Sequence, residues 1–512
     1  MKKKLLRLTT ILCVSVLAVT STSLIAQGQT AWKPTTPPGA AMPENGVATQ
    51  GRYIMHISEQ ANLNSSTASF MLDTAQNQLR TKDNFFVCLD PGPRLDCGTG
   101  KPGSYMVRAL LPACGAVVES CIEKVWIYKS GEAAVEATPV RTTQGLKTKG
   151  YPTLGIPRGD GVTIWSSGLS HSGGSGNYVV SATLSAQTTS SGQVNISEFN
   201  VKVLPVQEVS VSGAIIPEFT ICRGPQDNRG DNVGDCLNNG NFDGNTTCAY
   251  TQTGVCGEVQ EFAEGTRVAV QLRLHNEVSG WFHGRVKSPN LQVSRIDSRY
   301  NRVRIDALPG AVSRFLTESR GDLGDLDPTK ILEHGFGGQF LLVDSTQQSA
   351  FTMLETYRNR ANDTAAGVSN LWSISSMPAQ SVSYTGSQCL TDTSRVLGVV
   401  TTNATAYSGA APVFKNGFLN YEVAGMHYLP GGKELSQGSY DLVMRSDVAR
   451  CLYGFDRAPL SAKVSVVNDQ GTKTFATTVV NEKNGWLRMA AYGFTFSEKT
   501  IKVKITKAKK KR

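Results

Sequence analysis

The chain has 512 residues, of which 40% are hydrophobic and 18% are charged, and its formal net charge is +10. Most of this charge lies at the two ends: four basic residues fall within the first seven positions and five within residues 507–512. Without these nine residues the net charge is +1, so an extended basic face of the kind that binds nucleic acid is not indicated. We therefore expect no nucleic-acid partner.

The N-terminus has the three-part pattern of a secretory signal. Basic residues precede an apolar run that ends near Val19, and the small residues Ala26 and Gly28 follow. The run is shorter than the ~20 residues that a membrane-spanning helix needs. We expect a signal peptide over 1–28, cleaved after Gly28 or after Ala26, then a Pro-rich linker over 29–50. No later stretch is apolar enough to cross a membrane, so the sequence predicts a secreted or cell-surface protein that is not integral to the membrane.

The cysteine count agrees with export. Of 11 cysteines, Cys13 lies in the predicted signal, which leaves an even number. An even count in an oxidising compartment favours disulfides. The spacing suggests the pairs Cys88–Cys97, Cys114–Cys121, Cys222–Cys236, Cys248–Cys256 and, by elimination, Cys389–Cys451. Zinc is the alternative, but there is no CxxC motif and only six histidines, so we favour disulfides.

Alternating apolar and polar residues predict a mainly β protein of multidomain, β-sandwich-like units. Clear strand patterns lie over 105–111, 124–129, 162–167, 178–186, 199–206, 267–276, 281–287, 291–297, 301–308, 439–446, 462–468, 473–481, 485–496 and 500–506. The turn Asn468–Gly471 between two such runs predicts a hairpin. We expect a β-rich domain over 51–206, a Cys/Asn/Asp-rich loop region and second β-rich domain over 207–385, a C-terminal β-rich domain over 386–506 and a basic tail over 507–512.

Helical patterns are limited to the middle unit. Residues 311–318 and 349–362 are the best candidates, and the second places Phe351, Leu354 and Tyr357 near one face. The sequence therefore predicts a small helical insertion between about Pro309 and Asn370.

Several segments of the second half resemble one family. They are SGWFHGRVKSPNLQVSRID (279–297), SNLWSI (369–374), CLTDTSRVLGVVTTNA (389–404), FLNYEVAGMHYLPGG (418–432), SYDLVMRSDVARCLYGF (439–455) and NGWLRMAAYGFTFS (484–497). They are similar to a family of large, uncharacterised secreted proteins of actinobacteria, most clearly over about 259–506. The resemblance implies an exported, surface-associated protein that ends in a β-rich module. It implies no activity and no site residues.

The segment 227–248 is rich in Asp, Asn and Gly. Asn239, Asn241 and Asp243, followed by Gly244, have the alternating oxygen ligands and the glycine of a calcium loop. Position 12 of such a loop is Tyr250 rather than a bidentate Glu, so the segment is not an EF-hand. A possible calcium site and a polar loop pinned by disulfides both remain open.

Catalytic motifs are scarce. There is no GxSxG or HExxH motif, and His171, in SHSGGSG, fits a loop between strands. The acidic residues Asp322, Asp325 and Asp327 fit a solvated loop better than a glycosidase pair. Five strand-associated tryptophans, 126, 165, 281, 372 and 486, are expected in cores rather than stacked on sugars.

These observations favour an exported, non-enzymatic binding or adhesion protein whose partner is an extracellular or cell-envelope glycan, or another envelope component. The alternatives are a secreted hydrolase acting on polysaccharide and a structural component of the envelope or an appendage. The sequence leaves the ligand, any catalysis, the oligomeric state and the mode of surface retention open.

Overall fold

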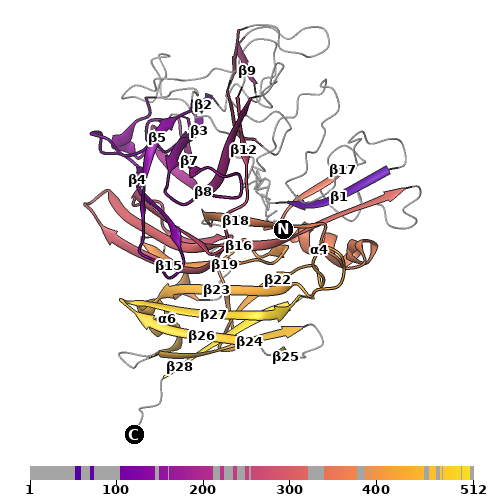
Figure 1. The fold of residues 1–512 in the computed structure, drawn as a ribbon. Coiled ribbons are helices and arrows are strands. Elements are labelled where there is room, and N and C mark those ends of the chain that lie inside the picture. Colours follow the sequence, from indigo (N-terminus) through magenta and orange to yellow (C-terminus); the bar gives the residue numbers. More distant parts are fainter. Residues whose placement is uncertain are drawn as a thin grey trace, which may run out of the picture.

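The computed structural model of the protein (Figure 1) describes residues 52–58, 70–73, 104–143, 149–159, 161–210, 220–223, 235–238, 248–252, 255–320, 340–377, 387–392, 394–454, 460–468, 473–474, 477–496 and 499–507. In these ranges the chain is mainly β, with 28 strands and two short α-helices. The expectation of a mainly β protein is therefore confirmed. The predicted signal, the linker and residues 508–512 of the tail lie outside the described residues.

Eight strands form a closed ring of hydrogen-bonded neighbours. In order around the ring they are β4 (Cys121–Lys129), β5 (Glu136–Thr142), β6 (Thr163–Ser166), β7 (Asn177–Thr188), β8 (Val194–Ser210), β18 (Gly367–Ser376), β16 (Tyr300–Arg320) and β13 (Thr266–His275), which pairs with β4 again. Each of these strands contributes inward-pointing side chains to the first hydrophobic core, among them Val125, Val203, Val270, Ile305 and Trp372. The ring takes strands from both 51–206 and 207–385, so these two ranges share one core.

Further strands extend the ring at its margins. The strands β3 (Tyr105–Leu110) and β2 (Phe70–Asp73) continue from β7, and β12 (Val255–Val259) and β11 (Cys248–Gln252) continue from β8. The strands β1 (Arg52–Ser58) and β15 (Val286–Arg295) each pair with β16, and β17 (Phe340–Asp344) pairs with β1. A separate hairpin joins β9 (Thr220–Arg223) to β10 (Asp235–Asn238).

A second unit follows the ring, and its strands from β19 to β28 are orange to yellow in Figure 1. One sheet has the order β14 (Gly280–Gly284), β19 (Val396–Thr402), β23 (Gln437–Arg445), β27 (Trp486–Thr495) and β26 (Thr477–Lys483), and β14 also pairs with β18 of the ring. The other sheet contains β20 (Ala406–Tyr407), β21 (Val413–Lys415), β22 (Phe418–Ala424), β28 (Lys499–Lys507), β24 (Leu460–Asn468) and β25 (Lys473–Thr474). Both sheets contribute to a second core, for example through Leu442, Met489, Tyr421 and Ile501.

The hairpin predicted at 468–471 is confirmed by the pairing of β24 with β25, in which Val467 lies opposite Lys473. The helix predicted at 349–362 is also confirmed. It consists of α4 (Gln348–Tyr357) and the 3-10 turn η2 (Arg358–Ala361), and Met353, Leu354 and Tyr357 are buried. The other helical elements of the described ranges are α6 (Ser446–Tyr453), η1 (Pro152–Leu154) and η3 (Gln388–Leu390), none of which the sequence pattern predicted.

The helix predicted at 311–318 is wrong, because these residues continue strand β16. Residues 310–314 pair with β18 and residues 315–320 with β1. Val312, Ser313 and Phe315 are all buried, so both faces of the strand are covered at this point. A strand covered on both faces needs no alternation of apolar and polar residues, and its pattern imitates that of a helix.

Candidate functional site

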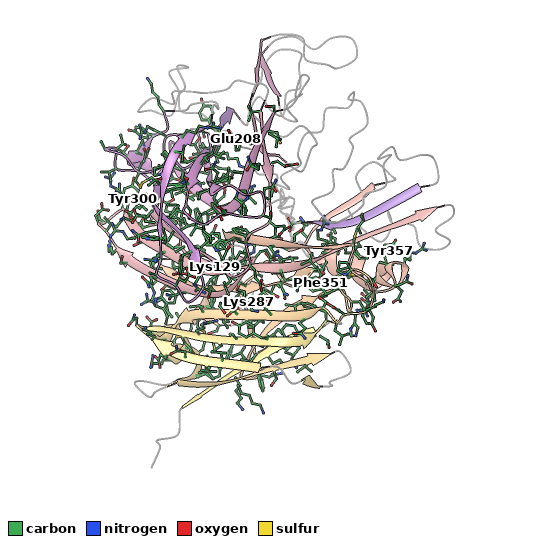
Figure 2. The ribbon with its side chains drawn as sticks, viewed as in Figure 1. Lys129, Glu208, Lys287, Tyr300, Phe351 and Tyr357 are labelled. Carbon is green, nitrogen blue, oxygen red and sulfur yellow. A yellow bond between two sulfur atoms is a disulfide. The ribbon has the colours of Figure 1, made fainter. Side chains whose placement is uncertain are left out.

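A groove of about 740 Å³ lies where the ring meets the second unit, and we call it the junction groove. The ring contributes residues 262–266 before and at the start of β13, Leu308, Pro309 and Ala311 of β16, Lys287 of β15, and Asn370 of β18. The second unit contributes Asn403, residues 437–439 of β23, and Tyr492 and Gly493 of β27. Figure 2 shows Lys287 between the ring and the second unit. The groove therefore depends on the contact between the ring and the second unit, whose strands β19 and β23 also contribute Val396, Val399 and Val443 to the first core.

A buried carboxylate holds the floor of the groove in place. Asp441 is 0% exposed and accepts hydrogen bonds from the Tyr492 hydroxyl (2.6 Å), the Arg488 guanidinium (3.0 Å) and the Ser288 backbone N–H (3.0 Å). Burial raises the pKa of Asp441, and the hydrogen bond from Tyr492 and the charge of Arg488 oppose that rise. Burial and the neighbouring Asp441 raise the pKa of Tyr492 to about 12, so its hydroxyl is a donor at neutral pH.

The backbone beside the floor of the groove has an unusual conformation at Ser288. Ser288 follows Lys287 at a register shift in β15 and has φ 55°, in the left-handed region that residues other than glycine seldom occupy. This conformation accompanies the hydrogen bond from the Ser288 N–H to Asp441. Strained residues of this kind cluster at functional sites.

The walls of the groove carry a cation, an aromatic ring and side-chain amides. The ammonium of Lys287, which is exposed, lies 5.3 Å from the centroid of the Tyr492 ring. The Asn403 amide donates to the backbone carbonyls of Ala311 and Gln437 and so ties β16 to β23. Asn370 is exposed and donates to Glu261 across 2.8 Å. Amides, an aromatic ring and a cation suit the binding of a polar ligand.

Two predicted disulfides are confirmed: Cys114–Cys121 and Cys389–Cys451. Cys256 is also disulfide-bonded. The backbone register places Cys222 directly opposite Cys236 in the β9–β10 hairpin, as the predicted pair requires, and Cys248 lies on β11, which pairs with the strand of Cys256. Cys88 and Cys97 lie outside the described residues.

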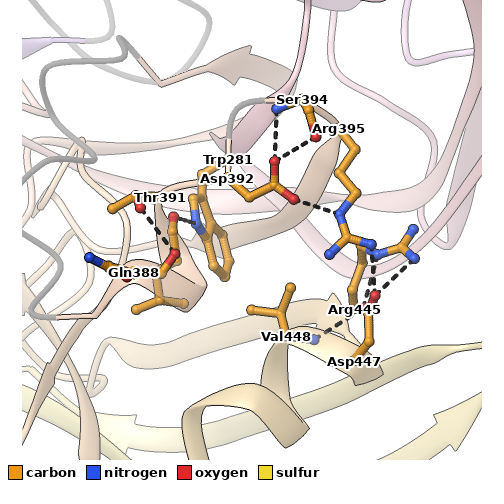
Figure 3. Close-up of polar contacts among 10 residues, drawn as sticks. Trp281, Gln388, Thr391, Asp392, Ser394, Arg395, Arg445, Asp447 and Val448 are labelled. Atoms are coloured by element: carbon orange, nitrogen blue, oxygen red, sulfur yellow. Dashed lines mark hydrogen bonds and ion pairs between the residues drawn. The ribbon is translucent and has the colours of Figure 1, made fainter.

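Ion pairs surround the long-range disulfide. Asp447, in the first turn of α6, bonds Arg395 (2.7 Å) and Arg445 (3.0 Å), and Arg395 also bonds Asp392 (2.8 Å) (Figure 3). Burial works against ionisation of Asp447, but the hydrogen bonds from Arg445 and Arg395 lower its pKa to about 2. Trp281 donates its ring N–H to the Leu390 carbonyl, so η3 is fixed to β14 as well. This network is structural and lies apart from the residues that line the groove.

The predicted calcium residues Asn239, Asn241 and Asp243 lie outside the described residues, as do Asp322, Asp325 and Asp327. Within the described ranges, no group of three or more His, Cys, Asp or Glu side chains has the arrangement of a metal site. Calcium at 239–243 therefore stays a prediction.

His171 occupies a loop between strands, as the sequence predicts, and its hydrogen bonds exclude it as a base for its neighbour Ser175. The His171 Nδ1 accepts from the Gly173 backbone N–H, so the ring proton is on Nε2. That Nε2–H donates to the Val206 carbonyl at 3.0 Å. Burial lowers the pKa of His171 and outweighs the opposing hydrogen bond to Val206, which keeps the ring neutral. Ser175 lies 2.9 Å from Nε2, but a nitrogen that carries a proton does not accept the serine proton.

The tryptophans divide into two groups. Trp165, Trp281 and Trp372 are 3%, 0% and 1% exposed, which confirms that they lie in cores. Trp126 and Trp486 are only half-buried, and an arginine lies over each ring: Arg304 at 4.0 Å and Arg445 at 6.0 Å.

The sequence analysis did not identify Lys287, Asp441 or Tyr492 as site residues. For Asp441 the sequence does contain a signal, because a lone carboxylate within the apolar run YDLVM requires a partner once the strand is buried. No comparable signal exists for Lys287 and Tyr492, whose importance comes from the meeting of distant strands.

Comparison of the chain with protein-family models, curated proteins and solved structures yields no match. Among the helices of the described ranges, none is both long and apolar enough to span a membrane.

Proposed function

We propose that the protein is an exported, non-enzymatic binding protein, displayed at the cell surface or released, that holds a glycan or another envelope component in the junction groove. The groove carries this proposal: its floor is preorganised by Asp441 under Tyr492, and its walls offer Lys287, Asn370 and backbone groups. Preorganised aromatic and amide groups suit sugar rings, which have apolar faces and hydroxyl edges. The second unit, in which two sheets enclose the second core, would be the sandwich-like module that displays the groove.

Export has independent support in the covalent structure. Disulfides persist in oxidising compartments, and two of them, Cys114–Cys121 and Cys389–Cys451, are present together with a predicted signal. The proposal of binding rather than catalysis rests on the environment of Asp441. It is fully buried and engaged by three donors, so it positions Tyr492 and is not available to a substrate.

The test is calorimetric titration of the oxidised mature protein with neutral oligosaccharides of the cello-, malto- and manno-series and with isolated cell-wall polymer. Lys287→Ala and Asn370→Ala change exposed side chains and should leave the melting temperature unchanged. Each should weaken binding at least about tenfold, equivalent to about 1.4 kcal/mol. Lys433→Ala, at an exposed position of the second unit outside the groove, is the matched control. Absence of binding to every probe, or equal affinity of all variants, would refute the groove as the binding site.

A further inference from the structure

The outer surface of the ring carries a patterned face over β4, β13, β16 and β15. Inward residues of these strands, such as Val125, Val268 and Ile305, belong to the first core, so the alternate residues face outward. The cross-strand register aligns them in rows: Trp126 with Ala269 and Asp306, Lys124 with Gln271 and Arg304, and Arg273 with Arg302. We call this the arginine face and define it by Lys124, Trp126, Gln271, Arg273, Arg302 and Arg304.

Two carboxylates hold the arginine side chains in fixed positions. Glu123 accepts from Arg302 Nε at 2.6 Å and from Gln271 at 2.9 Å, and Arg273 lies 3.5 Å from it. Burial works against ionisation of Glu123, but these hydrogen bonds and charges outweigh it and lower its pKa. A guanidinium has five N–H donors, and a carboxylate engages one or two of them. Arg302 is 45% exposed, so it presents its remaining donors to solvent in a fixed orientation.

The second carboxylate, Asp306, does the same at the other end of the face. It accepts from the Tyr128 hydroxyl at 2.9 Å and from Arg267, and Arg304 lies 3.7 Å away. The arginine side chains are therefore already restricted before a ligand binds. Binding then costs less side-chain entropy than it would for flexible surface cations.

Trp126 lies in the same cross-strand row as Asp306, on the far side of Ala269. Its cross-strand neighbours are Ala269 on β13 and Glu136 on β5, so on the β13 side no large side chain fills the adjacent position. The Arg304 guanidinium lies 4.0 Å from the centroid of the indole ring, which remains half-exposed. An indole beside a fixed guanidinium presents an apolar face and hydrogen-bond donors together, which matches a sugar ring that carries an acid group.

We propose that the arginine face is a second binding site, distinct from the junction groove, and that it binds an acidic polysaccharide with one carboxylate per sugar. Five basic side chains on or beside this face (124, 267, 273, 302 and 304) exceed its three acidic ones (123, 136 and 306), which leaves a net charge of +2. Duplex DNA carries one charge per about 1.7 Å and needs a denser cationic surface. Spaced cations, amides and one aromatic ring suit a more sparsely charged chain.

The test is affinity electrophoresis of the oxidised full chain in gels that contain polygalacturonate, with neutral dextran and duplex DNA as comparison polymers. We expect polygalacturonate to retard the protein, and this retardation should weaken with added salt. Dextran should retard it little, and DNA should retard it less than polygalacturonate does at equal charge concentration. Arg304→Gln and Trp126→Ala should each weaken the apparent affinity at least tenfold while the melting temperature changes little. Lys433→Gln removes one positive charge elsewhere and should leave the affinity unchanged.

Three results would overturn the proposal: no retardation of the wild-type chain, equal loss in Lys433→Gln and Arg304→Gln, or tighter binding of DNA than of polygalacturonate. Each leaves the neutral-oligosaccharide test of the junction groove standing, because that test uses uncharged ligands and other variants.

Discussion

The Tyr492 hydroxyl donates to the fully buried Asp441 carboxylate across 2.6 Å, from β27 to the neighbouring strand β23. Tyr492→Phe removes this donor and leaves Asp441 with Arg488 and the Ser288 N–H. Hydrogen bonds to charged groups contribute about 1.5–3 kcal/mol, so we expect the free energy of unfolding to fall by that amount in urea titrations.

Tyr300→Phe is the matched control for this prediction. Tyr300 is 0% exposed, and its hydroxyl donates to the neutral carbonyl of Pro152 at 3.0 Å. Loss of a neutral hydrogen bond should cost about 0.5–1.5 kcal/mol. If the two variants lose equal stability, the charge on Asp441 is not what makes the Tyr492 contact strong.

Lys202 predicts an unusual dependence of stability on pH. It lies on β8, opposite Ser181 of β7 and Ser373 of β18, and is 3% exposed. Burial, with the nearby charge of Arg108, lowers its pKa from 10.5 to about 7. Between pH 7 and 10.5 the unfolded chain binds more protons at this site than the folded chain does. The free energy of unfolding should therefore rise with pH in this window, by up to about 1.4 kcal/mol per unit.

Urea titrations at pH 7, 8 and 9 measure this slope. Lys202→Met should flatten it, whereas Lys463→Met, at an exposed position of β24, should retain the wild-type slope. Identical slopes in the wild type and Lys202→Met would show that the buried lysine does not control the pH dependence.

The two disulfides should differ in their contribution to stability. Cys389–Cys451 spans 62 residues and joins η3 to α6, whereas Cys114–Cys121 spans seven. Loop-closure entropy predicts a loss of about 4 kcal/mol when the long-range pair is replaced by alanines and about 2 kcal/mol for the short one. Urea titrations of the two double variants compare these values, and an equal or reversed order would mean that packing around the sulfurs outweighs chain entropy.

Strand positions were largely predictable because one face of most strands meets a core. In β13 the alternation of apolar and polar residues matches a covered face, which carries Val268, Val270 and Leu272, and a more open face, which carries Arg267, Gln271 and Arg273. Ring closure was not predictable, since the pairing of β18 with β8 joins residues about 170 positions apart. Local patterns indicate that a strand exists but carry little information about its partner.

The candidate site was less predictable than the fold for the same reason. Asn403 and Tyr492 approach Lys287 only because β14 connects the ring to the second unit. Trp126 was placed wrongly for another reason. Its strand pattern indicated a core position, but its inward neighbours Val125 and Ile127 put it on the outer face, where it is half-exposed beside Arg304.

The two interpretations of the segment with Asn239, Asn241 and Asp243, a calcium site and a polar loop pinned by disulfides, are separated by a direct thermal test, in which a calcium site gives the following result. A ligand at 100 times its dissociation constant stabilises the folded state by about 2.7 kcal/mol. Millimolar calcium should therefore raise the melting temperature of the oxidised protein relative to EDTA, and Asp243→Ala should abolish the rise. Magnesium is the control, because it demands near-ideal octahedral geometry that a loop with two asparagines does not supply. Coincident curves with calcium and EDTA would leave the segment as a polar loop pinned by disulfides, since asparagine and glycine are also the residues that tight turns require.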